Sequence, residues 1–268
     1  MYAFTLEQPN VLADAVQLAG TGARPLAGGQ TLLASMKLRL SDPGRLVDLA
    51  GIPDLSSIIR EGDAFRIGAM ARHLAVANDA ALRSDYPALA NLASRIGDRQ
   101  VRAMGTLGGS VANNDPAACY PSAVLASGAT VITDRREIAA DDFFQGLFAT
   151  ALEEGELITA IRFPIPQAAA YEKLRQKASH FPLVGVFVAR FASGVRVAVT
   201  GAGNGVFRHA GLEQALTTSF TPEAAAAVAI DATELSSDLH ASAAYRANLV
   251  SVMTQRAVAR ALQPDAGH

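Results

Sequence analysis

The chain has 268 residues, of which 50% are hydrophobic and 18% are charged, and its net charge is −2. This composition predicts a sizeable core in one large domain or two modest ones. No basic stripe is present, so we expect no nucleic-acid partner. The single cysteine, Cys119, excludes an internal disulfide, a cysteine-rich zinc site and an iron–sulfur cluster within this chain. The sequence shows neither a signal-peptide pattern nor an apolar run near the roughly 18 residues of a membrane span, which predicts a cytoplasmic protein without membrane insertion.

The first part of the chain alternates short strands and helical segments. Strands are expected over 2–6, 24–27 and 45–49. A helix is expected over 10–19, with Asn10 as the N-cap. Residues 32–40 are expected to form either a short helix or an extended segment. This order predicts a small α/β subdomain with parallel strands.

The remainder predicts a second subdomain and a smaller C-terminal domain. Strands are expected over 57–60, 64–68, 129–133 and 156–163, and helices over 74–79, 87–95 and 121–127. Residues 167–170 are interpreted as a linker. Beyond them, apolar segments over 171–177, 183–191 and 195–200 predict three antiparallel strands, followed by helices from about residue 208.

Two uncharged glycine pairs stand far apart in the sequence. Gly28 and Gly29 lie in the segment 27–31, here called loop one, and Gly108 and Gly109 lie in the segment 106–110, here called loop two. Glycine lets the backbone approach a ligand closely, so each loop could offer bare N–H groups to an anion. Neither loop fits G-x-x-x-x-G-K-[ST] or G-x-G-x-x-G. An ordinary turn is the alternative for loop one, but the two loops together predict a pyrophosphate held from two sides.

The sequences AGGQTLLASMKLRL, IGAMARH, RQVRAMGTLGGSVANNDPAACYP and YEKLRQKASHFPLVGV resemble the FAD-binding medium subunits of the molybdenum hydroxylases. That family includes aerobic carbon monoxide dehydrogenase and xanthine dehydrogenase, and the resemblance covers nearly the whole chain. It implies an α+β fold, with a vanillyl-alcohol-oxidase-like (PCMH-type) FAD domain over 1–168 and a C-terminal domain over 169–268. The FAD domain would divide into subdomains over about 1–55 and 56–168.

The resemblance also implies which residues contact FAD. The pyrophosphate and ribityl contacts would come from the two loops and their flanks: Leu26, Ala27, Gly28, Gly29, Gln30, Thr31, Leu32, Leu33, Thr106, Leu107, Gly108, Gly109 and Ser110. Ile96 would touch the flavin or the adenine, and Ile158 would make a backbone contact. Lys173 matches a basic residue near the ring, where a cation would stabilise the reduced flavin. Cys119 stands where many members have an aspartate that bonds the cofactor.

The family's activity implies an electron relay. A large partner chain would oxidise substrate at molybdopterin, a small partner would carry two [2Fe-2S] clusters, and the FAD would pass electrons to quinone, NAD or oxygen. A dimer of heterotrimers is the expected assembly. Two alternatives stay open: a self-sufficient flavin oxidase or dehydrogenase, and an assembly subunit without cofactor. No catalytic residue and no metal site are expected in this chain, and His73 is interpreted as structural.

Overall fold

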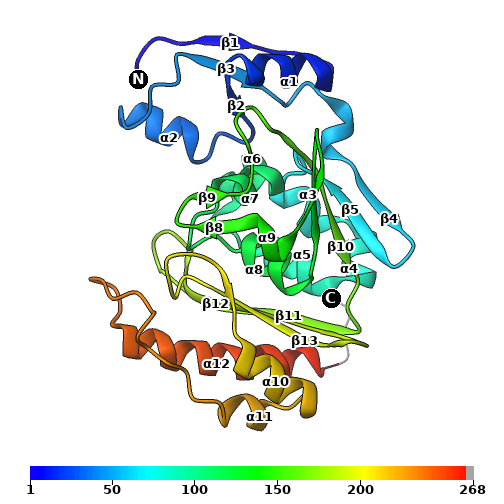
Figure 1. Ribbon diagram of the computed structural model, residues 1–268, viewed down its shortest axis with the longest axis vertical. Coiled ribbons are helices and arrows are strands. Elements are labelled where there is room, and N and C mark those ends of the chain that lie inside the picture. Colours follow the sequence, from blue (N-terminus) through cyan, green and yellow to red (C-terminus); the bar gives the residue numbers. More distant parts are fainter. Residues whose placement is uncertain (264–268) are drawn as a thin grey trace.

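The computed structural model describes residues 1–263, which form three units stacked along the long axis of the molecule (Figure 1). Each unit is built on its own β-sheet, and the chain passes through the units in order. The N-terminal unit and the helices of the C-terminal unit therefore lie at opposite ends of the molecule (Figure 1).

The first unit is a three-stranded parallel sheet in the order β1-β3-β2. Its elements are β1 (Thr5–Glu7), α1 (Leu12–Gly20), β2 (Arg24–Leu26), α2 (Leu32–Lys37), β3 (Arg45–Asp48) and the 3-10 helix η1 (Pro53–Ser56). The parallel pairing that the sequence predicts is confirmed. The expected Asn10 cap is wrong, because Val11 occupies the N-cap position of α1 and makes no side-chain hydrogen bond there.

The second unit contains a five-stranded antiparallel sheet in the order β4-β5-β10-β6-β7. Its strands are β4 (Ile58–Glu61), β5 (Ala64–Gly68), β6 (Thr130–Thr133), β7 (Glu137–Ala139) and β10 (Ile158–Pro164). Its helices are α3 (His73–Asn78), α4 (Ala80–Asp85), α5 (Pro87–Ser94), α6 (Arg99–Met104), α7 (Leu107–Asn113), α8 (Tyr120–Ala126) and α9 (Ala140–Phe143). A separate two-stranded hairpin joins β8 (Phe144–Gly146) to β9 (Ala149–Thr150).

Loop two lies at the start of a helix, which sequence reasoning did not predict. α7 begins at Leu107, so it contains most of the segment 106–110, and α6 ends just before it at Met104. Each helix has a capped start: the Asp98 carboxylate accepts from Val101 N at 2.8 Å, and the Thr106 hydroxyl accepts from Gly109 N at 3.2 Å. Such caps satisfy amides that the first turn of a helix otherwise leaves without partners.

The third unit is an antiparallel sheet in the order β11-β12-β13-β14. Its elements are β11 (Ala168–Arg175), β12 (Pro182–Phe191), β13 (Gly194–Thr200), β14 (Phe207–Arg208), α10 (Ala210–Thr218), α11 (Pro222–Ala226) and α12 (Ala243–Ala261). The short β14 adds a fourth strand to the three expected. The linker interpretation of 167–170 is wrong from Ala168 onward, because Ala168–Ala170 pair with Val188–Arg190 of β12.

Both faces of this third sheet are buried. Val184, Val186 and Val188 of β12 join a core with α10 and α12. Phe187 and Ala189 on the opposite face join the core of the second unit, against α5 and α8. Burial on both faces explains why β12 is an almost continuous apolar run in the sequence.

Candidate functional site

Loop one connects the end of β2 to the start of α2 and keeps its amides open. Gly29 has φ +69°, a left-handed conformation that favours glycine. The backbone amides of Gly28, Gly29, Gln30, Thr31 and Leu32 donate to no atom of residues 1–263. The Gln30 side-chain amide instead folds back and donates to the Gly28 carbonyl at 3.2 Å. Five successive free N–H groups are the donor set that an anion requires.

Loop two, in contrast, uses its amides within the protein. Leu107 N and Gly108 N donate to the Ala71 and Ala69 carbonyls at 3.0 and 2.7 Å, and Ser110 N donates to Thr106 O at 3.1 Å. Gly109 N donates to the Thr106 hydroxyl. The expectation of bare N–H groups is therefore wrong for these four residues of loop two. Its glycines serve close packing instead, since a Cβ on Gly108 would lie 2.5 Å from the Ala69 Cβ.

The structure brings the two loops into contact, although about 80 residues separate them in the sequence. A Cβ on Gly28 would overlap the Met104 carbonyl oxygen and lie 2.7 Å from Gly105 Cα. A Cβ on Gly109 would lie 3.2 Å from the Ala27 Cβ. The glycines therefore let the first and second units approach each other here. This contact places the open amides of loop one beside the start of α7.

His73 lies directly behind the contact and is buried. Burial, assisted by the Arg102 charge, lowers its pKa to about 4, so the imidazole is neutral near pH 7. Its ring centroid lies 5.3 Å from that of Tyr120. A Cβ on Gly105 would lie 2.5 Å from His73 Nε2, which explains why glycine is required at position 105.

Three of the remaining predicted residues lie together at the junction of the second and third units. The Lys173 ammonium donates to the carbonyls of Arg95 and His180 at 2.9 and 2.7 Å and lies 3.4 Å from Cys119 Sγ. Ile96 follows Arg95, and its carbonyl accepts from Arg102 at 3.0 Å. Ile158 is at the start of β10, separate from this group. Its neighbour Thr159 accepts from Ala69 N, next to the start of α7.

Sequence reasoning missed the residues that position the loops. The carbonyls of Ala69, Ala71 and Met104 shape the contact, and a backbone carbonyl carries no sequence signal. Gly105 could have been found, because it adds a third glycine close to the pair in loop two.

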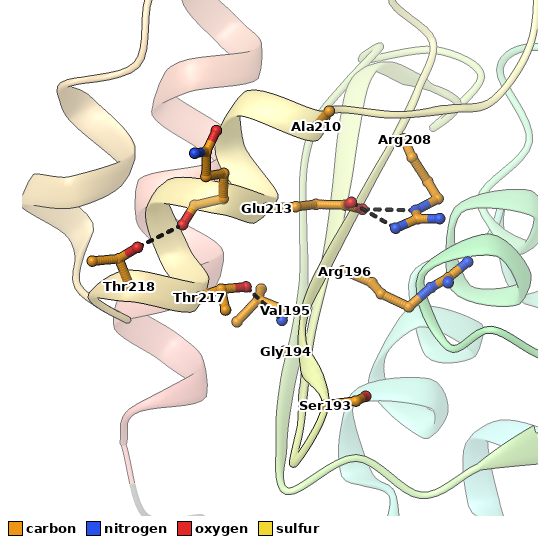
Figure 2. Close-up of a pocket in the computed structure, with 10 residues that line it drawn as sticks. Ser193, Gly194, Val195, Arg196, Arg208, Ala210, Glu213, Thr217 and Thr218 are labelled. Carbon is orange, nitrogen blue, oxygen red and sulfur yellow. Dashed lines mark hydrogen bonds and ion pairs between the residues drawn. The ribbon is translucent and has the colours of Figure 1, made fainter.

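A separate cavity of about 460 Å³ lies in the third unit between β13 and α10 (Figure 2). Its charged side chains already have partners: Arg208 contacts Glu213 at 2.6 Å, and both Arg208 and Arg196 contact Asp141. Asp141, on α9, is thus the shared ion-pair partner of two arginines of the third unit. The cavity contains none of the residues predicted to bind FAD.

The contact of loop one (residues 27–31) with the start of α7, here called the cradle, fits FAD. The open amides of loop one can donate to the negatively charged oxygens of a diphosphate. The missing β-carbons at Gly28 and Gly109 allow the close backbone approach that a dinucleotide needs. Comparison with known proteins agrees. Residues 2–166 match the family described as FAD binding domain in molybdopterin dehydrogenase, and residues 169–261 match the CO dehydrogenase flavoprotein C-terminal domain. The chain belongs to the FAD-binding medium subunits of the molybdenum hydroxylases.

Relatives of this family match the chain over nearly its full length. The carbon monoxide dehydrogenase medium chain of Afipia carboxidovorans is 38% identical, with 96% of each chain covered. The nicotine 6-hydroxylase medium subunit of Paenarthrobacter nicotinovorans is 35% identical, covering 94% of this chain and 95% of the relative. Among solved structures, reconstituted CO dehydrogenase from Oligotropha carboxidovorans gives a TM-score of 0.90 at 35% identity, covering 97% of this chain and 98% of the other.

The chain is thus an FAD-binding subunit of an oxidoreductase of this family. Within residues 1–263, no helix combines the length and the apolar character that crossing a bilayer requires.

Proposed function

We propose that this subunit relays electrons from iron–sulfur clusters in a small partner chain to an external acceptor through its FAD. The observation that carries the proposal is the set of open loop-one amides beside the start of α7. The single cysteine supports the relay, because one thiol cannot hold a cluster in this chain. The bound flavin would supply a carrier that exchanges electrons singly or in pairs.

The residues of the chain hold and orient the cofactor in this proposal. The amides of Gly28 to Leu32 donate to the diphosphate, and hydrogen bonds to a charged oxygen each contribute about 1.5–3 kcal/mol. Loop two contributes close packing and the Thr106 and Ser110 hydroxyl groups. Lys173 is the buried cation that we assign to the neighbourhood of the flavin ring.

The proposed partners are a large molybdopterin-binding chain and a small chain with [2Fe-2S] clusters, joined as a dimer of heterotrimers in the cytoplasm. The matched relatives carry the names of medium chains or subunits, which supports a multi-subunit assembly. We also propose the domain division at residue 168, with the first domain split near residue 55.

A rapid-mixing experiment tests the relay without knowledge of the substrate. The FAD-loaded chain is mixed anaerobically with its co-expressed partner chains, which have been reduced with dithionite and freed of excess reductant. We expect the visible absorbance of the flavin to fall as it is reduced, by an amount proportional to the quantity of partner chains added. Bound flavin that stays oxidised while the clusters stay reduced would contradict the relay.

The same preparation distinguishes the two alternatives. An isolated yellow chain that oxidises an added substrate without partners would indicate a self-sufficient flavin enzyme. A chain that stays colourless after incubation with excess FAD would indicate an assembly subunit without cofactor.

A further inference from the structure

Cys119 and Lys173 approach each other from different units of the molecule. Cys119 is the residue before α8, Lys173 lies on β11, and Sγ and Nζ are 3.4 Å apart. Both residues are buried, with 5% and 7% of their surfaces exposed. Because Cys119 is the only cysteine of the chain, this thiol has no disulfide partner within it.

The Lys173 nitrogen is held in place with one side facing the sulfur. Two carbonyl oxygens, from Arg95 and His180, accept hydrogen bonds from it. No carboxylate of residues 1–263 forms an ion pair with it; its neighbour Glu172 binds Arg95 and Arg260 instead. Burial lowers the pKa of Lys173, and the interaction with Cys119 offsets this only in part. The amine of Lys173 is therefore neutral, and so nucleophilic, in a larger fraction of molecules than the amine of an exposed lysine.

An unpartnered hydroxyl lies beside the same sulfur. Tyr171 is fully buried, and its hydroxyl has no hydrogen-bond partner among the residues that the structure describes. Burial is the main cause that raises the pKa of this phenol, and the neighbouring Cys119 raises it further. The phenol therefore stays protonated and can donate a hydrogen bond. Room for the hydroxyl exists because position 185 is glycine, where a Cβ would lie 2.5 Å from it. A buried donor without an acceptor could hydrogen-bond to an oxygen atom bound to the neighbouring sulfur.

We propose that Cys119 and Lys173 form a reversible covalent N–O–S cross-link when the protein is exposed to dioxygen. One oxygen atom of dioxygen bridges Sγ and Nζ, and the other leaves as water with one hydrogen from the thiol and one from the amine. The sulfur and nitrogen together lose the four electrons that reduce both oxygen atoms. A thiol reductant reverses the oxidation, as it does for other low oxidation states of cysteine sulfur.

The location of the pair determines which oxidants react and what the cross-link does. Burial favours a small oxidant such as dioxygen over a bulky disulfide such as oxidised glutathione, so a mixed disulfide is not expected. The bridge would join the start of α8 to β11 and so fasten the second unit to the third. It would also remove the positive charge of Lys173. This inference concerns two side chains of the protein and does not rest on the proposed electron relay.

Intact-mass spectrometry of the full-length chain tests the cross-link. The protein is incubated in air or anaerobically with a thiol reductant, denatured, alkylated and weighed. We expect the air-treated chain to gain about 14 Da, one oxygen minus two hydrogens, and to resist alkylation at Cys119. Reductant should reverse both effects, and peptide mapping should join the segments that contain residues 119 and 173.

Three variants make the test specific. Cys119→Ser and Lys173→Arg should each abolish the gain of about 14 Da, whereas the exposed Lys177→Arg should retain it. Circular dichroism checks that each variant is folded. If Lys173→Arg does not fold, Cys119→Ser still provides the test. The proposal would be overturned if the mass of the air-treated chain did not change or rose only by whole oxygen atoms. It would also be overturned if folded Lys173→Arg showed the same gain in mass as the wild type.

Discussion

Gly28 shows how one missing β-carbon shapes the cradle. Its backbone does not need a left-handed conformation, unlike that of Gly29, so the requirement at position 28 is purely steric. The Met104 carbonyl and Gly105 Cα occupy the space that any side chain at position 28 would need. The identity of Gly28 therefore depends on a contact between the first and second units, which the local sequence does not reveal. An ordinary turn was for this reason an alternative interpretation of loop one.

Gly28→Ala should weaken FAD binding and destabilise the fold. The added methyl group must displace backbone of the second unit, which costs about 1–3 kcal/mol in a packed region. FAD content per chain and urea unfolding measure the two effects. Gly20→Ala is the matched control, because a Cβ on Gly20, at the end of α1, meets no atom within 4 Å. Equal FAD content in the two variants would contradict the assigned role of Gly28.

Glu156 should make stability depend on pH in the acidic range. Its carboxylate is fully shielded and contacts the Arg136 guanidinium at 2.9 Å, and it accepts from the Thr133 hydroxyl and Glu153 N. The hydrogen bond from Arg136 is the main cause that lowers its pKa from 4.5 to about 2. Because the pKa is lower in the folded state, this stabilisation is complete above pH 4.5 and is lost as the pH falls to about 2.

Urea unfolding of the wild type and Glu156→Gln at a series of pH values measures this contribution. The free-energy difference between the two proteins should shrink by about 3 kcal/mol over that range, since each pKa unit corresponds to about 1.4 kcal/mol. A difference that does not change with pH would show that Glu156 is not the titrating group.

At the scale of elements, α7 is the helix that most needs its cap. It has only seven residues and includes two glycines, each of which costs about 1 kcal/mol relative to alanine within a helix. The Thr106 hydroxyl and the carbonyls of Ala69 and Ala71 fix the position of its first turn. The cap therefore stabilises the element that lies against loop one.

Thr106→Ala should lower stability by about 1 kcal/mol and also weaken FAD binding. Thr221→Ala removes a cap of the same kind from α11, where the hydroxyl accepts from Ala224 N at 3.2 Å, in the third unit. We expect a similar loss of stability in this control with unchanged FAD affinity, measured by thermal unfolding and fluorescence titration. If both variants lost FAD equally, the effect would be one of global stability.

How much the sequence predicts differs between these elements. The hairpin of β4 and β5 and the apolar run of β12 were predictable, because side-chain alternation or a continuous apolar run signals their burial. α6 and α7 were not, since their glycines and polar residues favour loops and only tertiary contacts hold them. The fourth strand β14 pairs only two residues, too few for a sequence pattern. At the site, motifs found the glycine pairs, but only the fold shows which amides stay open.

At the scale of the whole molecule, the second unit contacts both others and connects the cradle to the third sheet. Arg95 binds the Tyr171 carbonyl at 2.7 Å, and Arg196 binds the Leu125 carbonyl at 2.8 Å. These contacts place Lys173 and Cys119 at the junction of the second and third units. The arrangement of three stacked units in Figure 1 thus brings residues from distant parts of the sequence together at the contacts between units.

Arg196→Met should weaken the attachment of the third unit to the second. The variant leaves the Leu125 carbonyl and the Asp141 carboxylate without this partner, and loss of such a charged hydrogen bond costs about 1–3 kcal/mol. Hydrogen exchange should show faster exchange in β13 and α8 while β1 and β3 stay unchanged. A uniform increase in the exchange rate throughout the chain would contradict a local role of Arg196.

A crystal structure of the chain with FAD would show directly which atoms hold the diphosphate. We predict that the diphosphate lies in loop one, with its oxygen atoms about 3 Å from the amide nitrogens of Gly28 to Leu32. The assignment of loop one would be contradicted if the diphosphate were bound elsewhere. It would also be contradicted if the loop-one amides donated to carbonyls of the chain itself in the complex.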